Sequence, residues 1–140
     1  GPYALKLAEN NVVQIVDTTL FVHGGVQPVH VAAGLETLNT EHRAWLRGDA
    51  PLSELWHGDN SPVWDRTYSD ETTAEGCALL AETLDLLGLE RMVVAHTVQD
   101  DGINSACDGR VFRIDVGLSA YYDGPLQVLE ILGGVTTIVE

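Results

Sequence analysis

Two histidines each follow an apolar segment that is typical of a buried β-strand. His23 comes after residues 19–22 and is followed by two glycines, and His96 comes after residues 91–95. Binding sites in α/β sheets are commonly built at the carboxyl ends of strands, and glycine, which lacks a Cβ atom, lets a ligand approach the backbone. Because imidazole is a common metal ligand, the two histidines could converge on one metal ion. An ordinary polar role at a strand end is the alternative, and the spacing alone does not decide between them.

Arg66 is a candidate for binding an anion. The chain has only 7 basic residues, and this arginine lies between the aromatic residues Trp64 and Tyr68. A guanidinium group can bind a carboxylate or a phosphate through two parallel hydrogen bonds. An ion pair with Asp65 or Asp70 is the alternative explanation for an arginine at this position.

Composition and charge restrict the classes of protein to which the chain can belong. Its 140 residues are 45% hydrophobic and 20% charged, which is typical of one globular domain spanning residues 1–140. No apolar run approaches the roughly 18 residues of a membrane span, and the first residues lack the pattern of a signal peptide. The net charge of −14 repels phosphate backbones and anionic lipids, so nucleic acid and membrane surfaces are not expected partners.

The cysteine content gives an expectation about the redox compartment. Cys77 and Cys107 are the only cysteines, and they lie far apart in the sequence. This pattern predicts two free, buried thiols in a reducing compartment. We therefore expect a cytoplasmic location, with an organelle as the alternative.

The pattern of apolar and turn residues predicts an α+β fold with two main helices and one mixed sheet containing several hairpins. The first main helix lies between residues 28 and 48, and the second begins at a capping sequence over residues 72–75 and ends at residue 88. His30 and His42 lie in the first helix and are expected to be exposed or interfacial. Six or seven strands are expected, and six of them can be assigned to residues 12–16, 19–22, 91–95, 111–116, 126–132 and 135–139.

Two segments outside these elements also carry expectations. A short helix over residues 3–9 is expected to precede the strands, with Leu5 and Leu7 facing inward. The irregular segment 49–70 contains Trp56 and Trp64, whose large apolar rings predict that the segment packs against the domain.

Four segments of the chain, in order, carry a resemblance to a known family. They read LFVHGGV over residues 20–26, PVWDR over 62–66, MVVAHTVQ over 92–99 and FRIDVGLS over 112–119. Together they resemble the phosphoprotein-phosphatase branch of the calcineurin-like metallophosphoesterases, and most closely the Shewanella-like protein phosphatases. Ala95 stands where that family more often has glycine. The resemblance implies part of an α/β/β/α sandwich.

The resemblance also implies a role for each matching residue. His23 and His96 correspond to metal ligands, Arg66 to the arginine that holds the substrate phosphate, and Tyr121 or Tyr122 to a tyrosine that lines the phosphate site. The implied cofactor is a pair of divalent ions (Mn, Fe or Zn). The implied reaction is hydrolysis of a phosphomonoester by two-metal catalysis, with a phosphoserine, phosphothreonine or phosphotyrosine protein or a small phosphoester as substrate.

Three motifs of that family do not occur in this sequence. They are the Asp-x-His pair, the Gly-Asp-x-x-Asp-Arg-Gly segment and the Gly-Asn-His-Glu segment, which supply the other metal ligands and the general acid. We therefore expect the chain to correspond to the C-terminal half of such an enzyme and to be inactive alone. A fragment, a split protein completed by a partner chain, and a half-domain that dimerises or swaps are the three alternatives, and each would leave an apolar sheet face to be covered.

Two further functions remain open at this point. A non-catalytic interaction or assembly module could retain the phosphatase scaffold without its site. A mononuclear metal-binding module could use His23 and His96 together with nearby carboxylates.

Overall fold

Short apolar segments pair into the sheet that organises the molecule. The computed structural model describes residues 1–140, and its main sheet has five strands in the order β1-β2-β3-β5-β4. The central pairs, β2 with β3 and β3 with β5, are parallel, whereas β1 and β4 pair antiparallel at the two edges. The strands are β1 (Val13–Val16), β2 (Thr19–Val22), β3 (Arg91–Val94), β4 (Asn104–Ala106) and β5 (Val111–Arg113).

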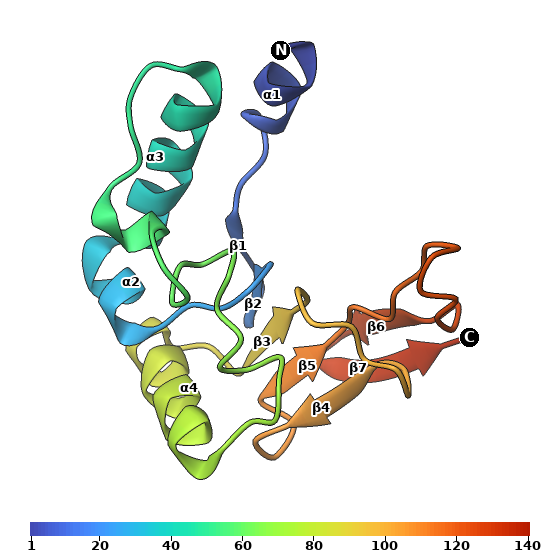
Figure 1. Ribbon diagram of the computed structural model, residues 1–140. Helices are drawn as coiled ribbons and strands as arrows, with labels where there is room; N and C mark the ends of the chain where they lie inside the picture. Colours follow the sequence, from blue (N-terminus) through green and yellow to red (C-terminus); the bar gives the residue numbers. More distant parts are fainter.

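Helices cover one face of this sheet, and a separate hairpin lies on its other side (Figure 1). The hairpin consists of β6 (Val128–Leu132) and β7 (Val135–Val139), which are joined by a turn at Gly133-Gly134. The predicted α+β fold with one principal mixed sheet is confirmed. The helices are α1 (Pro2–Leu7), α2 (Pro28–Ala33), α3 (Leu35–Arg47) and α4 (Ala74–Leu87), with one 3-10 turn at Glu54–Trp56.

The first predicted helical region is two helices instead of one. Gly34 has φ +96°, a backbone conformation that ends α2 and starts α3. The second main helix begins one residue later than the capping sequence over residues 72–75 implies, because the N-cap is Thr73, whose hydroxyl accepts a hydrogen bond from the backbone N–H of Gly76 at 3.1 Å. Strand β4 was not predicted, since its sequence Asn-Ser-Ala lacks the apolar alternation of the other strands.

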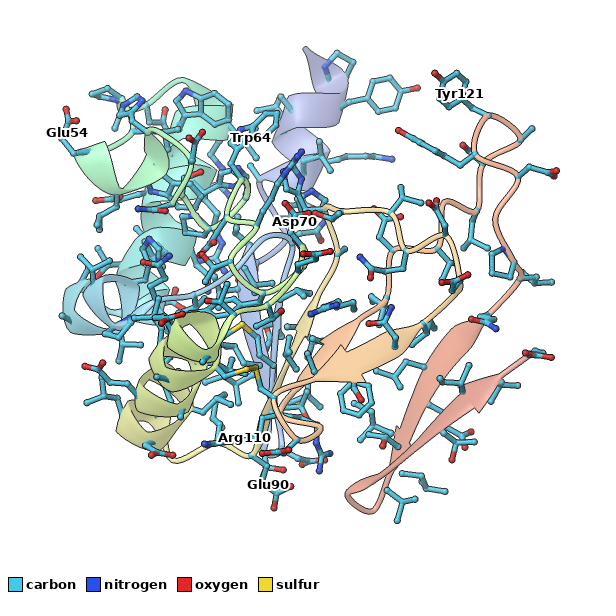
Figure 2. The ribbon with its side chains drawn as sticks, turned by 60° about the horizontal axis from the view of Figure 1, so that its bottom comes forward. Glu54, Trp64, Asp70, Glu90, Arg110 and Tyr121 are labelled. Carbon is cyan, nitrogen blue, oxygen red and sulfur yellow. A yellow bond between two sulfur atoms is a disulfide. The ribbon has the colours of Figure 1, made fainter.

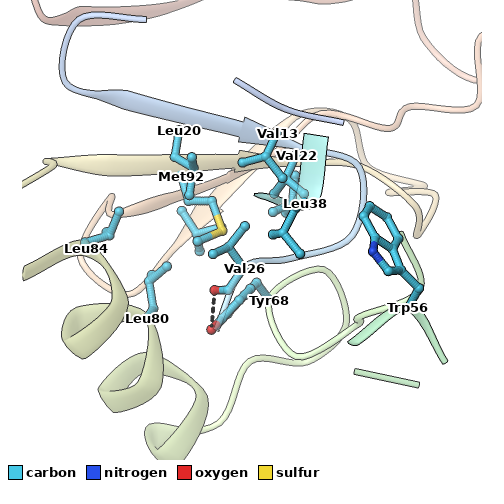
Figure 3. Close-up of a cluster of buried hydrophobic side chains, with 12 residues drawn as sticks. Val13, Leu20, Val22, Val26, Leu38, Trp56, Tyr68, Leu80, Leu84 and Met92 are labelled. Atoms are coloured by element: carbon cyan, nitrogen blue, oxygen red, sulfur yellow. Dashed lines mark hydrogen bonds between the residues drawn. The ribbon is translucent and has the colours of Figure 1, made fainter. Parts of the chain in front are cut away.

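Alternate residues of the central strands build the core on the helical face (Figure 3). Leu20 of β2 and Met92 of β3 are fully buried against Leu80 and Leu84 of α4. Tyr68 closes the same cluster, and its hydroxyl donates a hydrogen bond to the carbonyl of Val26 at 3.1 Å. Burial also raises the pKa of Tyr68, so the phenol is neutral and able to donate.

The two cysteines form a disulfide, which corrects the prediction of free thiols. Cys77 in the first turn of α4 is bonded to Cys107 in the turn between β4 and β5, and no free cysteine remains. Separation in sequence did not exclude pairing, because the sheet order brings this turn beneath α4. The cysteine count therefore gives no support to a reducing compartment.

Several predictions about single residues are also corrected. Leu5 and Leu7 are 57% and 56% exposed, because the six-residue helix α1 packs mainly against α3 and buries none of its own residues. His30 is buried, not exposed or interfacial, since its Nδ1 atom accepts the backbone N–H of Gln27 at the start of α2. None of the helices combines the length and the apolar character needed to cross a membrane.

Candidate functional site

The register of β2 and β3 brings the two predicted histidines together. The strands are parallel, with Phe21 opposite Val93, so their carboxyl ends meet at the same edge of the sheet. Just beyond this edge the backbone N–H of Ala95 donates to the carbonyl of His23 at 2.9 Å. The Nε2 atom of His23 lies 3.1 Å from the Nδ1 atom of His96.

The backbone and surroundings of His96 set the chemistry of its imidazole. This residue has φ +66°, a left-handed conformation that a non-glycine residue rarely adopts and that directs the ring toward His23. Burial lowers the pKa of His96, and the charges of Arg66 and His23 lower it further, against the opposing effect of Asp70 and Asp115. A lowered pKa keeps the ring neutral near pH 7, so a nitrogen lone pair is available for a ligand.

The paired nitrogens fit a shared metal ion. Two imidazole nitrogens that bind one Zn²⁺ at about 2.0–2.1 Å lie about 2.9–3.4 Å apart for bond angles from about 90° to 110°. The 3.1 Å separation between His23 and His96 lies in this interval. The Nε2 atom of His96, which carries the proton when Nδ1 binds a metal, is buried without a hydrogen-bond partner within this chain. No group of three or more His, Cys, Asp or Glu side chains could hold a metal, so this chain offers two ligands of such a site.

The two glycines after His23 are required for packing and not for ligand access. The backbone N–H groups of Gly24 and Gly25 both donate to the carbonyl of Pro62, at 2.9 and 3.1 Å. A Cβ atom on Gly24 would lie 2.8 Å from the backbone nitrogen of Asp65. The irregular segment therefore lies directly on the end of β2, where the sequence analysis expected space for a ligand.

Buried Asp65 anchors the irregular segment. Its carboxylate accepts hydrogen bonds from the Nε2 group of Gln27 at 2.9 Å and from the backbone N–H of Thr67 at 2.8 Å. These bonds fix the residues on either side of it, Trp64 and Arg66. Arg66 forms no ion pair with either neighbouring aspartate, which removes the alternative explanation for its presence. The spacing Asp-x-Thr, typical of a turn closed by an aspartate side chain, was the available sequence signal.

Trp64 and Arg66 lie beside the histidine pair. The indole of Trp64 makes an edge-to-face contact with the imidazole of His96, with ring centroids 5.0 Å apart. The prediction that the segment containing both tryptophans packs against the domain is confirmed, because Trp56 is buried and Trp64, although 58% exposed, contacts His96. An open pocket of about 550 Å³ borders this indole; it is lined by Asp59, Asn60, Trp64, Asp65, Arg66 and Thr67.

A polar network fastens the segment after Arg66 to the ends of β3 and β5. Gln99 donates to the carbonyl of Ser69 at 2.9 Å, and the hydroxyls of Ser69 and Thr97 are 2.8 Å apart. Arg113 of β5 donates to the carbonyl of Tyr68 at 2.9 Å. The sequence did not identify Gln99, Thr97 and Arg113 as positioning residues, because the atoms that they contact lie far away along the chain.

The two tyrosines predicted to line the phosphate site lie together on an exposed loop. Tyr121 and Tyr122 are 87% and 58% exposed on the loop between β5 and β6, and their rings contact each other edge to face with centroids 5.0 Å apart. Figure 2 shows Tyr121 well apart from Trp64 and Asp70. The structure thus brings His23, His96 and Arg66 together and leaves Tyr121 apart from Trp64 beside them, so a phosphate-lining role for either tyrosine stays a prediction.

Comparisons with known proteins support part of the resemblance. No family model matches the chain. It is 41% identical over 138 residues to Shewanella-like protein phosphatase 2 of Arabidopsis thaliana, covering 94% of this chain and 35% of that protein. It is 34% identical over 136 residues to an uncharacterized protein of Schizosaccharomyces pombe, covering 91% of this chain and 40% of that protein. The chain therefore spans less than half the length of the curated relatives it matches.

Solved structures show the same fold. A cold-active protein tyrosine phosphatase has a TM-score of 0.71 at 24% identity, covering 88% of this chain and 37% of that chain. A cold-active protein-tyrosine phosphatase of a psychrophilic Shewanella species has a TM-score of 0.75 at 20% identity, covering 94% and 41%. The resemblance of this chain to part of the Shewanella-like protein phosphatases is thus confirmed.

Proposed function

We propose that this chain, which is similar over nearly its whole length to part of a Shewanella-like protein phosphatase, forms part of a metal-dependent phosphatase. The observation that carries the proposal is the pair of imidazole nitrogens of His23 and His96, 3.1 Å apart at one sheet edge, with the unpaired guanidinium of Arg66 beside them. The substrate class is phosphoserine, phosphothreonine or phosphotyrosine protein, or a small phosphoester. Protein tyrosine phosphatases among the structural relatives support the phosphoprotein class.

Each residue has a defined task in this proposal. The Nε2 atom of His23 and the Nδ1 atom of His96 would hold divalent metal, with Mn, Fe or Zn as the candidate ions. When bound, a pair of such ions supplies charge to the phosphoryl oxygens and lowers the pKa of a bound water. Arg66 donates charge-assisted hydrogen bonds to the phosphate oxygens. Trp64 packs edge to face against the His96 ring and supports its orientation.

The remaining ligands would come from polypeptide outside this chain. His23 and His96 are two ligands, and no third His, Cys, Asp or Glu joins them in a group able to hold a metal. An apolar groove of about 250 Å³ lies next to them on the face without helices; it is lined by Asn11, Val12, Gln14, Phe21, Val22, His23, Val93 and Ile114. A segment that packed in this groove would bring its own side chains beside His23. We therefore expect the isolated chain to be inactive.

A metal titration of this chain tests the proposal without requiring turnover. Zn²⁺ added to the protein should shift the imidazole NMR signals of His23 and His96 together. His96→Ala should weaken binding by about 10-fold or more, because a ligand is removed. His57→Ala is the matched control, since His57 is exposed and outside the site. Equal binding by the wild type and His96→Ala would contradict the proposal.

A second candidate function, a non-catalytic assembly module, is favoured by the apolar surface of the hairpin. Leu132 and Val135, at its turn, are 73% and 66% exposed. The same titration separates the two functions. No metal response, together with a stable complex in which both histidines are covered by packed protein, would support assembly over catalysis. A mononuclear metal module would instead bind one metal ion per chain, and this chain alone would supply all the ligands of that ion.

A further inference from the structure

The open pocket beside Trp64 has a feature that phosphate binding alone does not require. A carboxylate, that of Asp59, and a guanidinium, that of Arg66, line the same pocket of about 550 Å³. Both side chains are exposed, and neither takes part in an ion pair. The ion pairs of the protein all lie elsewhere: Arg43–Glu36, Arg91–Glu90 and Arg110–Asp85.

The other aspartate of this pocket is not available to a ligand. Asp65 is fully buried, and its two carboxylate oxygens accept hydrogen bonds from Gln27 and from the backbone of Thr67. The pocket therefore presents one free negative group and one free positive group. Opposite charges that share a pocket without neutralising each other suit a ligand that itself carries both charges.

The two charges are arranged in a definite order from the histidine pair. Arg66 is close enough to His96 for its charge to lower the pKa of the imidazole, whereas Asp59 is not among the carboxylates, Asp70 and Asp115, that raise it. Trp64 joins the pocket to the histidine pair, since its ring contacts His96 and also lines the pocket. Its indole is 58% exposed and can accept a cation on its face. Asp59 and this indole thus form the cation-accepting part of the pocket, and Arg66 forms the part whose charge reaches His96.

We propose that this pocket binds the side chain of an arginine or lysine next to the phosphorylated residue of a polypeptide substrate. The inference rests on the proposed function for the placement of the phosphate at Arg66 and the histidine pair. An extended peptide advances about 3.3 Å per residue, so a neighbouring side chain can reach across one indole ring. The net charge of −14 favours the approach of basic polypeptides in general, and Asp59, Asn60 and Trp64 give the local recognition.

Short labelled peptides test this inference by fluorescence anisotropy with the whole chain in the presence of Mn²⁺. One peptide has arginine on both sides of the phosphorylated residue, and a second peptide has glutamate at the same two positions. Both peptides are made with phosphoserine and with phosphotyrosine. Unphosphorylated versions of all of them serve as references. The arginine peptide should bind about 3- to 30-fold more tightly than the glutamate peptide, the range expected for one exposed ion pair plus one cation–π contact. The preference should decrease at high salt.

Two variants of equal charge locate the effect. Asp59→Asn should reduce the preference for arginine about 2- to 5-fold. Glu54→Gln, which removes the same charge from an exposed residue that lies apart from Trp64 in Figure 2, should leave the preference unchanged. If both variants reduce it equally, the effect is one of overall charge and the pocket is not the cause.

The outcomes distinguish this inference from the proposed function. Tighter binding of phosphorylated peptides, with no difference between arginine and glutamate, would overturn the inference and leave the phosphatase proposal standing. An arginine preference that depends on Asp59 but not on phosphate would show a basic-peptide site and count against the phosphatase proposal. Binding that depends on neither feature would overturn the inference, while the proposed function is judged by the metal titration.

Discussion

The two faces of the main sheet are packed very differently. On the helical face, Leu20 and Met92 of the sheet and Leu80 of α4 are completely buried in one cluster. On the other face the β6–β7 hairpin covers the sheet loosely, and a cleft of about 220 Å³ remains between Phe21 of the sheet and Ile131 of the hairpin. The residues of the candidate site are positioned from the helical face. The other face is where further polypeptide has room to pack and complete the site.

Truncating leucines on the two faces should give the largest contrast. Leu80→Ala should lower the free energy of unfolding by about 2–5 kcal/mol, because it leaves a cavity under α4. Leu132→Ala removes the same atoms from a side chain that is 73% exposed and should cost less than about 0.5 kcal/mol. Urea unfolding of both variants measures the difference. Similar losses for the two would show that the hairpin packs as tightly as the helical face.

Removing the disulfide should have the next largest effect, and only on the helical face. The bond between Cys77 and Cys107 closes a loop with a sequence separation of 30, which stabilises the fold by about 2–4 kcal/mol in the chain-entropy account. Reduction, or the paired change Cys77→Ser and Cys107→Ser, should lower the melting temperature. Hydrogen exchange should rise in α4 and β4 and stay unchanged in β6 and β7. An unchanged melting temperature after reduction would contradict the expectation.

The sequence predicts best where local signals are repeated along the chain. The apolar runs over residues 19–22 and 91–94 identify β2 and β3, and the parallel pairing of these strands follows in the structure. The capping sequence over residues 72–75 locates the start of α4 to within one residue. In contrast, β4 carries no apolar pattern and depends on pairing with β5. The disulfide likewise depends on tertiary contact between distant segments, which spacing does not reveal.

The candidate site was predictable in part for the same reason. His23 and His96 are each marked by the strand that precedes them, and the register then sets their nitrogens 3.1 Å apart. Arg66 was identified by its aromatic neighbours. The buried anchor Asp65 was missed because its partners, a glutamine side chain and a backbone N–H, are not apparent from composition. The ligand-access role given to the glycines was wrong because their neighbour is a segment about 40 residues away in the chain.

Gly24 joins the end of β2 to the irregular segment, and a methyl group there should disrupt this contact. In Gly24→Ala the new Cβ would lie 2.8–2.9 Å from backbone atoms of Asp65 and Pro62, which cannot move as a flexible side chain would. We expect a loss of stability of about 1–3 kcal/mol and weaker Zn²⁺ binding, since Trp64 and Arg66 move with the segment. Gly76→Ala, where the nearest atoms are 3.3 Å away, should cost less. Unaltered Zn²⁺ affinity in Gly24→Ala would show that the segment does not position the site.

The smallest expected effect is a dependence of stability on pH that arises from the helical face. Burial lowers the pKa of His30 below its ordinary value of 6.5, against a weaker opposing effect of Asp65, and burial also lowers the pKa of His42. Below about pH 6.5 the unfolded chain therefore binds more protons than the folded one, so this stability is fully present above that pH and is lost as the pH falls.

Urea unfolding at several values between about pH 7 and pH 5 measures this dependence. His30→Gln loses the bond from Nδ1 to the Gln27 N–H and should be less stable at every pH, but its stability should fall less steeply as acid is added. His57→Gln is the matched control, since His57 is exposed and its loss should leave the steepness unchanged. If the stability of the wild type and of His30→Gln falls equally steeply with pH, the buried imidazole of α2 is not the group that couples folding to pH. The acid sensitivity would then have to arise from His42 or from carboxylates outside the helical core.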